Sequence, residues 1–213
     1  MVSRSLEKTI VMERILINIG RQFGSGGWLV AKALGEKLGI PVYDNELITK
    51  AAEESGFSRH LFARCDEKRS LFSFSSFFSS GRYVVADNYV SDNDLFRIQS
   101  DVIRKIADEG SAIFIGRCSD YILRDRECLD VFISAPEEIR IRRVAEREGI
   151  PEDEAARLVR TKDRTRSTYY NYFTFGDWGV ASNYDLCVDS SILGIEGTAD
   201  LVISVLHAKK PSA

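Results

Sequence analysis

The stretch Arg14-Ile-Leu-Ile-Asn-Ile-Gly20 runs directly into Gly20-Arg-Gln-Phe-Gly-Ser-Gly-Gly27. Its first part is β-branched and almost continuously apolar, which is typical of a strand covered on both faces in a parallel sheet. After the glycines, residues 28–38 carry apolar side chains at helical spacing, and Gly39 follows. The order strand, glycine-rich loop, helix indicates a phosphate-binding loop, because backbone amides can converge there and the helix start adds its positive dipole end.

Two other interpretations of this loop are weaker. A plain connecting turn does not need four glycines in eight residues. A dinucleotide fingerprint, Gly-x-Gly-x-x-Gly, does not fit the observed glycine spacing, and only Asp44 lies at a suitable distance to serve as its acidic residue. We therefore predict that the loop binds phosphate through Gly20, Gln22, Gly24, Ser25, Gly26 and Gly27.

The loop departs from the usual pattern Gly-x-x-x-x-Gly-Lys-[Ser/Thr]. If one extra residue is allowed, Gly27 stands where the lysine is expected and Trp28 where the magnesium-binding hydroxyl is expected. A helix dipole contributes at most about 2 kcal/mol to a bound anion. Fast phosphoryl transfer therefore needs another cation, and the nearest candidate is Arg21.

Further along the chain, strand-like apolar runs alternate with amphipathic helical runs. Strands are expected at residues 41–44, 111–116, 129–133 and 184–188, and helices at 45–55, 92–109, 136–148, from about 151 through 166, and at 196–208. This alternation predicts βαβ units and a parallel sheet. We expect one α/β domain over residues 1–213, with three layers, a five-stranded parallel sheet flanked by helices, and a P-loop NTPase-like fold.

Arginines follow the expected strands, where open α/β sheets bind their ligands. Arg117 ends the third strand, Arg142 and Arg143 follow the fourth, and Asp163 and Arg166 lie in a later helix. Convergent arginines suit phosphoryl transfer, which relies on cations placed around the developing charge. The alternative is a solvated helix face with ion pairs, since glutamates are interspersed, and we favour that alternative for Arg140 and Arg147.

These motifs, in this order, resemble the bacterial cytidylate kinases and, more closely, the cytidylate kinase-like proteins. The shared features are the start Gly-Arg-x-x-Gly-Ser-Gly-Gly, the segment Tyr43-Asp-Asn-Glu-Leu47, Gly116-Arg117, and Lys162-Asp-Arg-Thr-Arg166. Cys118 stands where cytidylate kinases have an aspartate. The likeness runs from about residue 15 to 206.

The resemblance implies a kinase that transfers the γ-phosphoryl group of ATP, with Mg²⁺, to a nucleoside monophosphate, with CMP or dCMP first among the acceptors. It implies a helical lid at about 137–180. In this interpretation the catalytic cations are Arg21, Arg142 and Arg143, and the acceptor is held by Asp44, Arg117, Asp163 and Arg166. Asp44 can equally serve as the cap of the following helix. No metal-binding protein residue is predicted.

Two other functions fit the missing lysine and hydroxyl. The chain could be a nucleotide-binding regulatory protein with weak catalysis, or a kinase of this fold that acts on a small molecule other than a nucleotide. Tyr169, Tyr170 and Trp178 could stack on a base or cover a closed lid, although packing is the commoner use of such residues.

The composition of the chain limits the classes of partner that we expect. The chain has 213 residues, 44% hydrophobic and 29% charged, with a net charge of −3, so we expect a cytoplasmic protein with nucleotide substrates and without DNA, RNA or membrane partners. Four scattered cysteines and two histidines favour neither disulfides nor zinc. An insertion at about 68–91 contains the serine- and phenylalanine-rich residues 70–80, whose aromatic side chains would suit a homodimer.

Overall fold

A computed structural model describes residues 14–54 and 92–209. Its centre is a parallel sheet in the order β2-β3-β1-β4-β5. The strands are β1 (Leu16–Arg21), β2 (Val42–Tyr43), β3 (Ala112–Ile115), β4 (Leu129–Ser134) and β5 (Leu186–Asp189). The glycine-rich loop therefore leaves the middle strand, with β3 on one side of it and β4 on the other. The predicted five-stranded sheet is confirmed.

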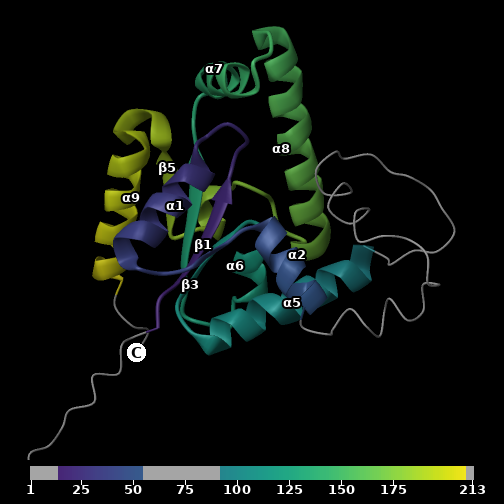
Figure 1. Cartoon of the computed structure of the whole chain (residues 1–213), viewed down its shortest axis with the longest axis vertical. Helices are drawn as coiled ribbons and strands as arrows, with labels where there is room; N and C mark the ends of the chain where they lie inside the picture. Colours follow the sequence, from purple (N-terminus) through teal and green to yellow (C-terminus); the bar gives the residue numbers. More distant parts are fainter. Residues whose placement is uncertain (1–13, 55–91, 210–213) are drawn as a thin grey trace, which may run out of the picture.

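Helices cover both faces of the sheet (Figure 1). On one face lie α1 (Gly27–Leu38) and α9 (Ser190–Ala208); on the other lie α2 (Asn45–Glu54), α5 (Asp92–Glu109) and α6 (Ser119–Ile122). The paired helices α7 (Glu137–Glu148) and α8 (Glu152–Thr174) stand beyond the ends of the strands, and a short 3-10 turn, Ala181–Asn183, precedes β5. This is the P-loop NTPase-like α/β fold, with α7 and α8 in the place of the expected lid.

The apolar run of β1 is buried on both sides, as its composition predicts. Ile17 and Ile19 pack with α1 and α9, whereas Leu16 packs with α5 and α6 on the opposite face. Ile17 is fully buried, so truncating it to alanine would cost about 2–5 kcal/mol. This double-sided packing holds the carboxyl end of β1, and with it the start of the loop, in a fixed place.

Local signals in the sequence also set the helix ends. Gly39 and Gly149 end α1 and α7 with left-handed backbone, at φ 66° and 67°. Asp44 caps α2, because its Oδ1 accepts hydrogen bonds from the amides of Glu46 and Leu47. Helix α9 differs from expectation at its start, because it begins at Ser190 rather than at 196.

Helix α9 is long and apolar enough, by length and composition, to cross a membrane, and it is the one such helix among the described residues, with a mean hydropathy of 1.3. Its backbone is broken at Gly194, where φ is 67°. Glu196 and Asp200 pair with Lys37 of α1, and its inner side packs on the sheet. These contacts make α9 a helix of the packed layer beside α1.

Parts of the sequence predictions lie outside the described residues. The insertion at 68–91, including the aromatic residues 70–80, is one of them. Within the described chain, the cysteines Cys118, Cys128 and Cys187 are free thiols.

Candidate phosphate site

The glycine-rich loop connects β1 to α1. Gly24 and Gly26 have φ values of 79° and 80°, which residues with a Cβ rarely adopt. Within the described residues, no hydrogen bond engages the amides of Gly24, Gly26 or Trp28. These N–H groups lie where α1 begins, so the loop offers an anion several donors together with the positive end of a helix.

Neighbouring helices leave no room for side chains at these glycines. A Cβ at Gly24 would lie 2.8 Å from the carbonyl oxygen of Arg140 in α7. One at Gly26 would lie 2.6 Å from Cδ1 of Ile195 in α9. The loop is therefore wedged between α7 and α9, and its shape depends on both.

Gln22 and Ser25, which the sequence assigns to phosphate, make contacts within the protein. Ser25 Oγ donates to the Gln22 carbonyl at 2.9 Å and accepts from the Gly27 amide at 3.4 Å. The Gln22 side chain accepts a hydrogen bond from the Ala135 amide at 3.2 Å. The two side chains shape the loop, and their contact with phosphate stays a prediction.

Arg21 lies with two other arginines on the β3 side of the loop. Its guanidinium reaches Gly116 at the end of β3, and Arg166 donates a hydrogen bond to its carbonyl oxygen at 3.2 Å. Burial lowers the pKa of Arg21 well below its ordinary value, and the charges of Arg166 and Arg117 lower it further, while Asp44 raises it. Three like charges gathered in this way indicate a site built for an anion.

Arg117 is presented by a tight turn after β3. Gly116, Arg117 and Cys118 all have left-handed backbone, with φ of 71°, 59° and 57°. Such a conformation costs of order 1 kcal/mol or more at each residue with a Cβ and is concentrated at functional sites. Burial lowers the pKa of Arg117, whose guanidinium lies over the ring of Tyr169. The turn thus directs a desolvated cation toward α8.

Asp44 and Trp28 lie next to this arginine group. The Trp28 indole is half exposed, and its Nε1 donates to Asp44 Oδ2 at 3.4 Å. Asp44 Oδ1 is engaged in capping α2. The capping role of Asp44 is confirmed, while its contact with an acceptor stays a prediction.

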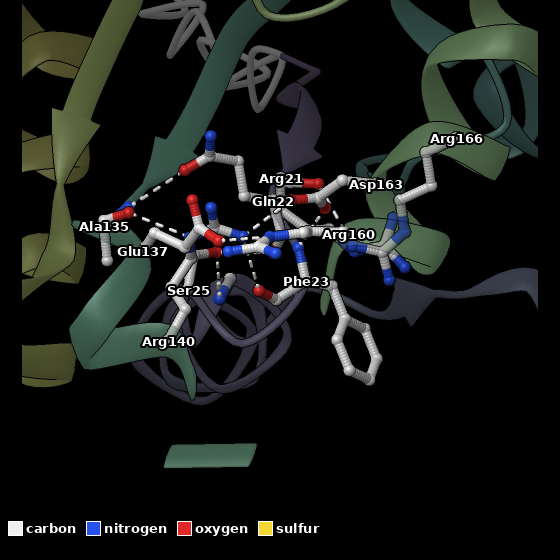
Figure 2. Close-up of polar contacts among 11 residues, drawn as sticks. Arg21, Gln22, Phe23, Ser25, Ala135, Glu137, Arg140, Arg160, Asp163 and Arg166 are labelled. Carbon is white, nitrogen blue, oxygen red and sulfur yellow. Dashed lines mark hydrogen bonds and ion pairs between the residues drawn. The ribbon is translucent and has the colours of Figure 1, made fainter. Parts of the chain in front are cut away.

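Asp163 and Arg140 hold the loop from α8 and α7 (Figure 2). Asp163 Oδ1 accepts from the Phe23 amide at 2.7 Å, and Oδ2 pairs with Arg140 at 2.6 Å. The prediction that Arg140 lies on a solvated face is wrong: it is buried, because its guanidinium also donates to the carbonyls of Ala135 and Phe23. Arg147 is exposed and pairs with Glu148, as expected.

The two arginines predicted to close over the donor differ in their surroundings. Arg142 is exposed on α7. Arg143 donates to the Ser25 carbonyl at 3.2 Å and to Ser190 Oγ at 3.1 Å. Arg143 therefore touches the loop itself, from the side of α9.

The aromatic residues of α8 and the segment after it serve packing. Tyr170 is buried and donates to Asp120 at 2.7 Å, and Tyr169 donates to Gln99 at 3.2 Å. Trp178 packs edge-on against Phe132. The packing interpretation of these residues fits the described structure.

The structure also has a hollow lined by carboxylates, which no sequence motif indicates. An open hollow of about 260 Å³ lies between α6, β4 and the end of α8, with Asp120 and Asp130 in its lining. Burial raises the pKa of Asp120, and raises that of Asp130 to about 6. Asp130 accepts a hydrogen bond from the buried Asn18. Neither carboxylate belongs to a recognisable motif, so only the fold brings them together.

The parallel sheet, the loop with unpaired amides and the arginine group together define a P-loop protein of the nucleotide-kinase type. A family model described as "Cytidylate kinase-like family" matches residues 16–192. The chain belongs to that family.

Two relatives that are named cytidylate kinase match this chain over most of its length and of their own. A cytidylate kinase of Methanopyrus kandleri is 29% identical over 204 residues, covering 91% of this chain and 92% of its own. One of Pyrococcus horikoshii is 24% identical, covering 93% and 92%. Their names support a kinase related to those that act on nucleoside monophosphates.

Solved structures agree on the fold. An uncharacterized protein of Eubacterium ventriosum has a TM-score of 0.69 at 28% identity, covering 92% of this chain and all of its own. A shikimate kinase of Bacteroides thetaiotaomicron has a TM-score of 0.52 at 14% identity, over 91% of this chain and 98% of its own. The second likeness concerns the fold alone.

Proposed function

We propose that this protein transfers the γ-phosphoryl group of ATP to a nucleoside monophosphate, with CMP or dCMP as the acceptor. The observation that carries the proposal is the pairing of two anion sites: the unpaired amides of the loop on one side and the arginine group on the other. Relatives named cytidylate kinase across most of the chain support the acceptor class.

The loop is the donor side of the proposed reaction. The amides of Gly24 and Gly26 and the first turn of α1 would hold the donor phosphates. Arg143 already contacts the loop and would turn toward an anion bound there, while Arg142 would approach from solvent. Both arginines would neutralise charge on the transferred group.

The acceptor side is the group of Arg21, Arg117 and Arg166, so the proposal moves Arg21 from the donor phosphates, where the loop pattern placed it, to the acceptor phosphate. These cations lie beyond the loop toward β3, where the acceptor phosphate would face the donor. No side chain needs to act as a strong base, because phosphoryl transfer depends chiefly on orientation and electrostatic stabilisation.

ATP fits the loop because several amides there have no partner among the described residues. Magnesium would enter with the nucleotide: it commonly binds through substrate phosphates and water, and no group of three or more His, Cys, Asp or Glu side chains in the described residues could hold a metal. When bound, it would shield the phosphate charge. We further propose a cytoplasmic protein whose partners are nucleotides, and a homodimer is to be tested by sedimentation.

A regulatory protein without useful turnover is the second candidate, favoured by Gly27 and Trp28 at the positions that the usual pattern gives to lysine and a hydroxyl. An assay of ADP release with CMP, dCMP, other nucleoside monophosphates and small non-nucleotide alcohols and acids separates the possibilities. Turnover with CMP or dCMP supports the proposal. Nucleotide binding without turnover supports the regulator, and turnover only with a non-nucleotide acceptor supports a different kinase.

A further inference from the structure

One peptide segment of the phosphate loop is held on both sides by a single ion pair. Asp163 of α8 accepts from the Phe23 amide, and Arg140 of α7 donates to the Phe23 carbonyl at 3.1 Å. The two side chains also bind each other at 2.6 Å. Figure 2 shows the labelled Asp163, Arg140 and Phe23 together, with the Phe23 ring directed away from the other two side chains. The peptide groups on both sides of Phe23 are thereby fixed to two helices that lie far away in the sequence.

This pair is buried, in contrast to a second pair between the same helices. The side chains of Arg140 and Asp163 are 7% and 17% exposed. Those of Arg160 and Glu137, which also join α8 to α7, are 71% and 44% exposed. The exposed pair makes no contact with the loop in the described structure, so its only link is from helix to helix. Burying a charge pair is costly unless its members are well bonded, and here the additional bonds go to the loop and to Ala135.

The bonds also decide which amides remain for an anion. Because the Phe23 amide is engaged by Asp163, it is unavailable to phosphate. The next residue, Gly24, has left-handed backbone, and a Cβ there would lie 2.8 Å from the Arg140 carbonyl oxygen, so the loop passes Arg140 closely only with glycine at this position. A loop without this support would have to be ordered by the ligand, and that ordering would weaken binding.

We propose that Arg140 and Asp163 are positioning residues for the phosphate loop, which hold Phe23 so that the amides of Gly24 and Gly26 are preorganised for a phosphate group. This proposal rests on the proposed function only in that the loop binds phosphate. The role proposed for the ion pair needs no contact with the ligand, and the predicted contact of Asp163 with an acceptor stays a prediction.

The test compares variants of the buried pair with variants of the exposed pair. The set is Asp163→Asn, the double variant Arg140→Met with Asp163→Leu, and the control Arg160→Met with Glu137→Gln. Replacing both members of a buried pair by apolar residues commonly preserves stability, so the double variant keeps the test valid if single changes prevent folding. Asp163→Asn is the conservative variant, because its amide oxygen can still accept from Phe23.

Two readouts are taken on the full chain. One is the dissociation constant of ATP by calorimetry; the other is the exchange rate of the Phe23 amide hydrogen by NMR. In the double variant we expect at least tenfold weaker ATP binding and at least tenfold faster Phe23 exchange, at a melting temperature within a few degrees of the wild type. Asp163→Asn should fall between the double variant and the wild type, and the control should match the wild type in both readouts.

The proposal is overturned if the double variant folds and keeps the ATP affinity and Phe23 exchange of the control. It is equally overturned if affinity falls only in proportion to stability across all variants, since that is the behaviour of a merely structural pair. A wild-type protein that binds no ATP would instead count against the proposed function, and the Phe23 exchange would still decide the role of the ion pair.

Discussion

The side chain of Arg21 occupies the place where a side chain at Gly27 would begin. A Cβ at position 27 would lie 2.6 Å from Cβ of Arg21 and 3.3 Å from Cβ of Ile133. The loop therefore accommodates arginine at its first turn because glycine stands at the start of α1. The usual pattern places lysine at the position of Gly27, and the Cβ of a lysine there would collide with Arg21. The cation of this loop is instead Arg21, whose guanidinium faces β3.

The first prediction concerns this steric coupling. Gly27→Ala should destabilise the protein by about 1–3 kcal/mol through overpacking, although alanine alone favours a helix. In the background of Arg21→Gly the same change should cost at least about 1 kcal/mol less, because the colliding Cβ is gone. Denaturant unfolding of the four proteins of the cycle measures the coupling. Gly110→Ala, where no atom lies within 4 Å, is the control and should change stability by less than about 0.5 kcal/mol. Strict additivity would show that Arg21 and Gly27 do not compete for space.

The second prediction concerns the arginine group. Inorganic phosphate should stabilise the wild type by about 2 kcal/mol at a roughly thirtyfold excess over its dissociation constant. Arg117→Met and Arg166→Met should each weaken phosphate binding tenfold or more, since one charge-assisted hydrogen bond contributes about 1.5–3 kcal/mol. Melting curves against phosphate concentration measure this. Arg164→Met, an exposed position on the same helix as Arg166, should retain the whole effect. If phosphate stabilised all three variants equally, the stabilisation would come from the general effect of phosphate as a salt and not from binding at the arginine group.

The third prediction separates the two roles of Asp44. Asp44→Ala should cost about 1 kcal/mol of stability because the amides of Glu46 and Leu47 lose their acceptor. Asp44→Asn should change stability by less than about 0.5 kcal/mol, since asparagine is an equally good cap. Unfolding experiments test the cap. Turnover with CMP in the asparagine variant then tests the acceptor role: a fall in kcat/KM at unchanged stability is the expected result, and unaltered kinetics would restrict Asp44 to capping.

The fourth prediction concerns pH and Asp130. Its folded-state pKa is raised to about 6, chiefly by burial, so the folded protein keeps a proton that the unfolded chain releases at lower pH. Its contribution therefore falls as pH rises from about 4 to about 6 and stays unfavourable above that range. Partial exposure to solvent reduces the cost to the order of 1–2 kcal/mol.

Asp130→Asn should accordingly raise the melting temperature at pH 7.5 and leave it little changed at pH 4. The asparagine can still accept from Asn18, so the hydrogen bond of the wild type can persist. Asp125→Asn, an exposed change in the loop before β4, is the control and should shift neither value. A constant difference between the Asp130 variant and the wild type from pH 4 to 7.5 would contradict the assignment.

Much of the fold follows from short stretches of sequence. The apolar run before Gly20, the left-handed glycines and the cap at Asp44 each act within a few residues, so their outcomes could be predicted from local physical chemistry. The order of strands and helices adds the parallel sheet, because such alternation has few compact solutions. The start of α9 was misplaced because Gly194 breaks the helical pattern near its beginning.

The sequence by itself determined that a parallel sheet carries a glycine-rich loop at the start of a helix, and that arginines follow the neighbouring strands. Only the tertiary structure decided which arginines gather beside the loop and which hold it. Arg140 looked like one charge among many on a solvated helix, yet it is buried against Phe23, 117 residues earlier in the chain. Such contacts depend on how separate elements pack together, and no local periodicity records that packing.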